Sequence, residues 1–105
     1  MDARVKQEEG TPAGGSATLV TVVAESTLER SLIGDLDRLG IGGYTISDAR
    51  GRGGHGLRGS GWEHASNIRL EVLCSPGCAG QLINHLRRQY EKDFAMTIWS
   101  QTVNR

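Results

Sequence analysis

The stretch from Ala49 to Trp62, ARGRGGHGLRGSGW, is the feature that most restricts how this chain can fold. Glycine has no side chain to bury and loses the most backbone entropy on ordering, so a run this rich in glycine cannot form part of a hydrophobic core. Its functional groups come mainly from three arginines and one histidine, namely Arg50, Arg52, Arg58 and His55. Guanidinium groups and closely approaching backbone amides both suit phosphate or carboxylate, so we predict an anion-binding loop.

The chain before this loop has the pattern of a strand, a helix and a second strand. Valine and threonine dominate the first segment on both alternating faces, which is typical of a central strand covered on two sides. Leucines then recur at helical spacing, Ser26 and Glu29 have the spacing of a capping box, and Gly40 can take the left-handed conformation that ends a helix. The predicted elements are a strand at Ala17–Glu25, a helix at Thr27–Leu39 and a strand at Tyr44–Ala49.

The chain after the loop repeats this kind of unit. In NIRLEVLC, alternate residues Ile68, Leu70, Val72 and Cys74 are predicted to share one face of a strand. Ser75 and Pro76 are typical of a helix cap and first turn, and an apolar stripe follows them. The predicted elements are a strand at Asn67–Cys74, a helix from about Gly77 to Tyr90 and a strand at Ala95–Val103.

The resulting order βαββαβ predicts an α+β, ferredoxin-like fold, with both helices on one face of an antiparallel sheet and a long loop between strands 2 and 3. The other face is then bare. We expect it to include Val20, Val22, Leu73 and Trp99, more apolar surface than a soluble monomer usually exposes. The pattern therefore predicts a homo-oligomer that packs through its sheets.

Composition places limits on the remaining classes. We expect residues 1–16 to be a disordered tail and residues 17–105 to form one domain. Acidic and basic residues balance, which argues against nucleic acid as a partner, and the absence of a long apolar run or an apolar leader favours a cytoplasmic location. Cys74 and Cys78 have neither disulfide-framework nor zinc-knuckle spacing, so we expect buried thiols and no metal site, although a site with His55 or His64 is an alternative.

Three motifs taken together resemble the PII signalling proteins over about residues 17–103. They are Gly43-Tyr44-Thr45-Ile46, then Gly51-x-Gly53, then Asn67-Ile68-Arg69-Leu70-Glu71-Val72-Leu73. The chain looks most like the PII-like regulators linked to bicarbonate transport and carboxysomes. The resemblance implies a homotrimer, adenine nucleotides bound between subunits, and a T-loop at about residues 51–66 that contacts a target protein. It also implies that the protein senses a ligand and is not an enzyme.

The resemblance also assigns roles to individual residues. Thr45, Gly51 and Gly53 match positions that hold phosphate and ribose, and Glu71 and Leu73 match positions near the adenine. Arg58 matches an arginine that PII-like members direct at the nucleotide phosphate. Beside these matches, we expect Arg69 as a supporting cation and Arg50, Arg52 and His55 as an anion pocket that could hold bicarbonate.

The chain departs from ordinary PII proteins in three places. Its glycine-rich loop has neither the glutamine that helps bind magnesium and 2-oxoglutarate nor the modified tyrosine, so nitrogen sensing is not expected. The segment Glu91–Phe94 lacks the glycine-lysine phosphate clamp, and the two arginines that follow the last strand in that family are missing. Fewer phosphate-directed cations favour AMP or ADP over a triphosphate.

Several alternatives remain open from the residues alone. A small ferredoxin-like enzyme, such as an acylphosphatase-like hydrolase, would also use a glycine and arginine phosphate cradle. An RNA-binding module has the same fold, but it would carry a basic surface and exposed aromatics on its central strands. If the chain is a PII-like regulator of inorganic-carbon or energy status, its target could be a bicarbonate transporter or a carboxysome component.

Overall fold

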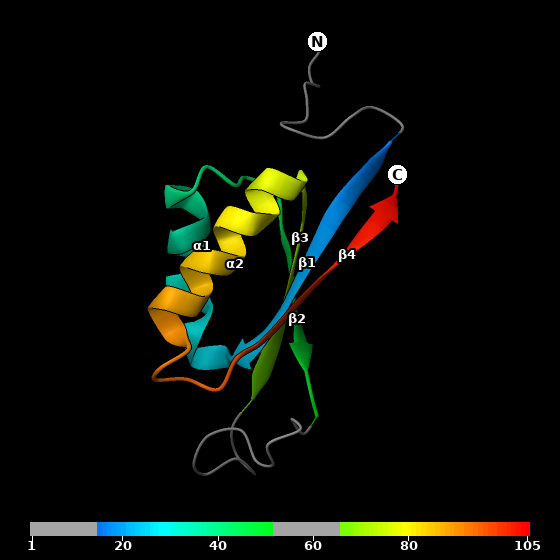
Figure 1. The fold of residues 1–105 in the computed structure, drawn as a ribbon. Helices are drawn as coiled ribbons and strands as arrows, with labels where there is room; N and C mark the ends of the chain where they lie inside the picture. Colours follow the sequence, from blue (N-terminus) through cyan, green and yellow to red (C-terminus); the bar gives the residue numbers. More distant parts are fainter. Residues whose placement is uncertain (1–14, 52–65) are drawn as a thin grey trace.

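The computed structural model describes residues 15–51 and 66–105, and these form a four-stranded antiparallel sheet with two helices against one face (Figure 1). The strand order is β2-β3-β1-β4. The elements are β1 (Ser16–Glu25), the short 3-10 helix η1 (Ser26–Leu28), α1 (Glu29–Arg38), β2 (Thr45–Ala49), β3 (Asn67–Cys74), α2 (Pro76–Tyr90) and β4 (Thr97–Asn104). The predicted α+β ferredoxin-like fold is confirmed, and β3 has the predicted bounds.

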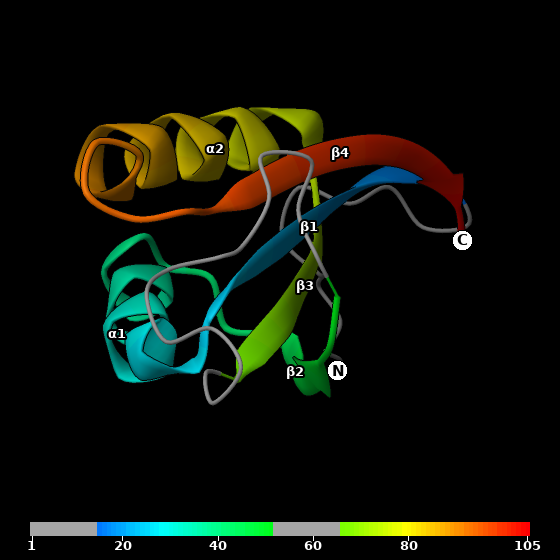
Figure 2. The same ribbon diagram turned by 90° about the horizontal axis from the view of Figure 1, so that it is seen from below.

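The core lies between the sheet and the two helices, which run side by side with α2 on the β4 side (Figure 2). One correction concerns β1. Val20 and Val22, expected on the bare face, are fully buried in this core, opposite Val72 and Leu70 of β3. Because both faces of β1 are apolar, its alternation could not identify the face that meets the helices. The core also includes Leu32, Leu36, Leu82 and Leu86 from the helices.

The open face of the sheet carries the two residues that were correctly expected there. Leu73 and Trp99 are 43% and 39% exposed. Trp99 lies opposite Thr21 of β1 in the strand register, and Thr21 in turn lies opposite Glu71 of β3. The open face is therefore a mixture of apolar and charged side chains.

The helix ends agree with the sequence in two cases and differ in one. Ser75 caps α2, since its Oγ accepts a hydrogen bond from the Cys78 backbone N–H at 3.2 Å. Gly40 ends the α1 segment with a φ of 77°, which a left-handed turn requires. The capping box of Ser26 and Glu29 is not formed. The Ser26 hydroxyl contacts the Ser66 hydroxyl instead. The first turn is the 3-10 helix η1, and α1 begins at Glu29.

No helix within the described ranges is long and apolar enough to cross a membrane. Two predictions from the sequence fall on residues that lie outside the described ranges. They are the disordered tail, up to residue 14, and the glycine-rich loop, over residues 52–65.

Candidate functional site

A pocket of about 670 Å³ lies at the end of the sheet where β2 begins and β3 ends. This volume is within the range of small-molecule sites. Five separate parts of the chain build it. Its lining includes residues 39–45 (the α1–β2 connection and the first residue of β2), the last residues of β3 (Glu71, Leu73, Cys74), the first turns of α2 (Cys78, Gln81), Leu19 of β1 and Arg105 after β4.

The α1–β2 connection forms one wall of the pocket. After the left-handed turn at Gly40, the Ile41 side chain turns into the core and its backbone N–H donates to the Leu36 carbonyl at 2.8 Å. The following residues Gly42 and Gly43 have open space where a Cβ would stand. This part of the pocket wall is therefore backbone that carries no side chain.

The pocket combines apolar walls with a few polar groups. Leu19, Leu39 and Leu73 present aliphatic surface, and Tyr44 is 39% exposed at its edge. The polar side chains are those of Thr45, Glu71, Gln81 and Arg105. Apolar walls suit a planar ring, a carboxylate can accept a hydrogen bond from a ring amino group, and a guanidinium suits a phosphate.

Three of the predicted site residues come together in this pocket, namely Thr45, Glu71 and Leu73. Thr45 and Glu71 are direct cross-strand partners in the register of β2 and β3. Arg69 lies nearby on the open face and does not line the pocket. Its Nε is 3.4 Å from the Glu71 carboxylate, and its guanidinium carbon is 5.8 Å from the centroid of the Trp99 ring.

The predicted anion-binding residues are placed differently. Arg50 and Gly51 are exposed at the opposite end of β2 from Thr45, and neither lines the pocket. Arg52, Gly53, His55 and Arg58 lie outside the described residues.

The sequence interpretation missed several lining residues. Arg105 directly follows β4, and its backbone N–H donates to the Gly15 carbonyl at 2.9 Å, which brings the end of β4 next to the start of β1. The sequence signal that could have identified Arg105 is a basic residue shortly after a predicted strand. Both cysteines line the pocket, with Cys74 buried as expected and Cys78 half-buried. The position of Gln81 in the predicted helix does not distinguish it from a solvent-exposed helix residue.

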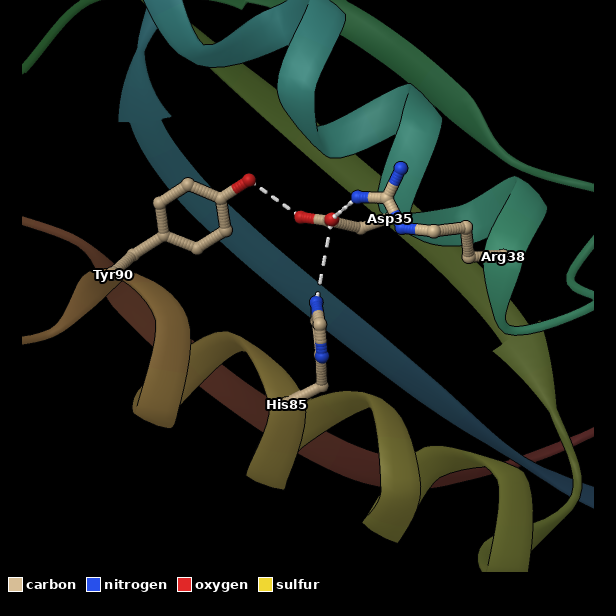
Figure 3. A network of polar contacts seen from close by, with 4 residues as sticks. All are labelled: Asp35, Arg38, His85 and Tyr90. Atoms are coloured by element: carbon tan, nitrogen blue, oxygen red, sulfur yellow. Dashed lines mark hydrogen bonds and ion pairs between the residues drawn. The ribbon is translucent and has the colours of Figure 1, made fainter.

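A second polar cluster, also missed, joins the two helices (Figure 3). Asp35 of α1 is only 2% exposed. Tyr90 of α2 donates its hydroxyl to Asp35 Oδ2 at 2.5 Å, Arg38 pairs with Oδ1, and His85 Nε2 is 3.3 Å from Oδ1. Burial, and then the hydrogen bond to Asp35, raise the pKa of Tyr90 from 10.0 to about 12.

Within residues 15–51 and 66–105, no group of three or more His, Cys, Asp or Glu side chains could hold a metal ion.

Comparison with known proteins places this chain in a family. No curated protein matches the chain. Among solved structures, one described as a PII-like signaling protein (TTHA0516) from Thermus thermophilus is 40% identical, with a TM-score of 0.70 over 85% of this chain and 88% of that chain. CPII from Thiomonas intermedia K12, bound to ADP, AMP and acetate, is 17% identical, with a TM-score of 0.74 over 87% of this chain and 89% of that chain.

A second CPII structure, bound to ADP, AMP and bicarbonate, is also 17% identical, with a TM-score of 0.70 over 86% of this chain and 94% of that chain. At this identity the CPII likeness shows the fold alone. The family profile described as "Nitrogen regulatory protein P-II" matches residues 17–105. Together with the 40% identical structure, this match shows that the chain belongs to the P-II family.

Proposed function

We propose that this protein is a PII-like regulator that binds an adenine nucleotide, AMP or ADP, in the pocket at the start of β2. The observation that carries the proposal is the meeting of Thr45, Glu71 and Leu73, which resemble nucleotide-contacting positions of the family, in one pocket of small-molecule size. The CPII structures that contain ADP and AMP support the same ligand class.

The proposed working form is a homotrimer. Leu73 and Trp99 leave apolar surface on the open face, and Leu73 also lines the pocket. A second copy packed on this face would cover both residues and lie next to the pocket, so a bound nucleotide would contact two chains. Nucleotide occupancy would then be communicated across the subunit boundary.

We further propose that occupancy is transmitted through the T-loop, residues 51–66, to a target protein. β2 connects the two regions directly, because Thr45 at one end lines the pocket and Gly51 follows the other end. Arg50, Arg52 and His55 form the proposed anion site, and the CPII structure with bicarbonate supports that co-ligand. The signal would report inorganic-carbon or energy status, with a bicarbonate transporter or carboxysome component as the target.

Calorimetry with AMP, ADP and ATP, with and without bicarbonate, tests the proposal. We expect AMP and ADP to bind more tightly than ATP. Glu71→Gln should weaken ADP about tenfold or more, since a hydrogen bond to a charged group contributes about 1.5 to 3 kcal/mol. Glu91→Gln, an exposed carboxylate outside the pocket, is the matched control and should bind like the parent. Absence of heat with every nucleotide would overturn the proposal.

Arg105→Ala provides a second test of how the nucleotide lies. Because Arg105 is a cation among the pocket residues, the variant should lose affinity for ADP and keep its affinity for adenosine. Equal losses for both ligands would contradict a phosphate at this position.

A further inference from the structure

The Asp35 cluster is a point where α1 and α2 are held together by charge in the interior. Asp35 is a nearly fully buried carboxylate on α1, and two of its three partners, His85 and Tyr90, come from α2 (Figure 3). A buried carboxylate needs partners because its desolvation is costly. These contacts therefore link one helix to the other in the interior.

His85 is the incomplete member of the cluster. Its Nε2 is buried and makes no hydrogen bond, although it lies 3.3 Å from Asp35 Oδ1. By contrast, Tyr90 donates a hydrogen bond to the same carboxylate and Arg38 pairs with it. Protonation gives the imidazole a donor on both nitrogens and a positive charge, so it would convert this unpaired contact into an ion pair. Histidine is also the side chain that changes charge between about pH 5 and pH 8.

Both helices lead from this cluster to the pocket. On α2, Cys78, Gln81 and His85 follow one another at spacings of three and four residues, so they share a helix face, and the first two line the pocket. On α1, the Asp35 carbonyl accepts the Leu39 backbone N–H at 3.0 Å, and the pocket lining starts at Leu39. A change in how α1 packs on α2 would therefore move two walls of the pocket.

We propose that Asp35 and His85 form a proton-linked clamp between α1 and α2. When His85 is protonated, it forms an ion pair with Asp35, and the walls of the nucleotide pocket then adopt fewer conformations. The effect on the pocket, which is the regulatory half of this inference, rests on the proposed nucleotide binding. The ion pair between the helices does not. Preorganised walls favour a ligand because less conformational freedom is lost on binding.

The other charged and titratable groups facing His85 support this direction. From α1 they are the Asp35 carboxylate and Arg38, whose side chain is 70% exposed, so solvent screens its repulsion. On α2 the neighbouring titratable side chains are the Tyr90 phenol, which donates to the same carboxylate, and Arg88, which is exposed. The sheet contributes apolar core residues. The buried carboxylate is thus the least screened charge near the imidazole.

The clamp is tested by thermal unfolding of the full chain at fixed protomer concentration, at about pH 8 and about pH 6. The parent should gain about 4 to 8 °C on acidification relative to His85→Gln. His64→Gln is the control, and it should keep the parent's pH response. Asp35→Asn retains shape without charge and should lose the response as His85→Gln does. Equal responses in the parent and His85→Gln would overturn the clamp, and so would an unchanged response in Asp35→Asn.

The regulatory half is tested by calorimetry with ADP on the parent and His85→Gln at the same two pH values. Because the ADP phosphate itself titrates near pH 6, the affinity of the parent for ADP is compared with that of His85→Gln at each pH separately. The parent should bind about fivefold tighter than His85→Gln near pH 6, and the two should agree near pH 8. A ratio that does not change with pH would show that the clamp does not regulate binding. If ADP bound neither protein, the proposed function would fail while the unfolding test still judged the clamp.

Discussion

Replacing Tyr90 by phenylalanine removes one hydroxyl from the interior and leaves the ring. The Tyr90 hydroxyl donates to Asp35 Oδ2 at 2.5 Å, and the residue is only 6% exposed. Its ring packs edge-on against Phe94 with centroids 6.0 Å apart, a contact that phenylalanine keeps. The change therefore removes only the polar contacts of the hydroxyl with α1, which are those with Asp35 and Ser31.

The expected cost follows from the contact that is lost. A hydrogen bond to a charged acceptor contributes about 1.5 to 3 kcal/mol. We expect Tyr90→Phe to lower the free energy of unfolding by about 2 kcal/mol, and the unfolding midpoint by about 8 to 16 °C.

The pH dependence has a definite sign. Because the folded-state pKa of Tyr90 lies above the unfolded value of about 10, its contribution is fully present below pH 10. It is lost as pH rises through about 12, when the folded phenol also ionises. The difference between parent and Tyr90→Phe should therefore shrink between these two values.

Urea unfolding followed by circular dichroism, at one protomer concentration, measures both quantities. Tyr44→Phe is the matched control because Tyr44 is partly exposed, and it should unfold like the parent near pH 8. The reasoning is refuted if Tyr90→Phe stays within about 0.5 kcal/mol of the parent near pH 8, since that is the scatter of ordinary surface substitutions.

Three further outcomes are expected from other positions. Gly40→Ala should cost about 1 to 2 kcal/mol in urea unfolding because φ is 77° there, whereas Gly42→Ala, with open space for a Cβ and an ordinary φ, should not destabilise. Ser75→Ala should cost about 1 kcal/mol by removing the cap of α2, and Ser75→Thr, which keeps a hydroxyl, should recover most of it. Trp99→Asp should reduce the mass measured by light scattering from that of a trimer to that of a monomer. Arg88 is exposed on α2, so the control variant Arg88→Asp should remain trimeric. A trimeric Trp99→Asp would contradict an interface on the open face.

The element order and several boundaries followed from local chemistry alone. In β3, charged residues occupy one set of alternating positions and aliphatic residues the other, so both the strand and its buried face could be predicted. The Ser75 cap and the Gly40 turn are likewise local, because each depends on the backbone of neighbouring residues. Of these segments, β3 also carried one of the motifs of the family resemblance.

The candidate site was predictable only where its residues lie on regular strands. Thr45, Glu71 and Leu73 could be named from the motifs, and the strand pairing brings them into one pocket. Gln81 and Arg105 could not, because only the folded arrangement of α2 and β4 brings them next to β3.

The sequence by itself determined the βαββαβ order and the alternating face of β3, since these depend on contacts within a few residues. Tertiary structure alone decided which apolar face of β1 meets the helices. It alone also brought Asp35 to His85 and Tyr90, which follow it by 50 and 55 residues. Local pattern cannot specify such pairs, because burying a charge is favourable only when a distant partner arrives with it.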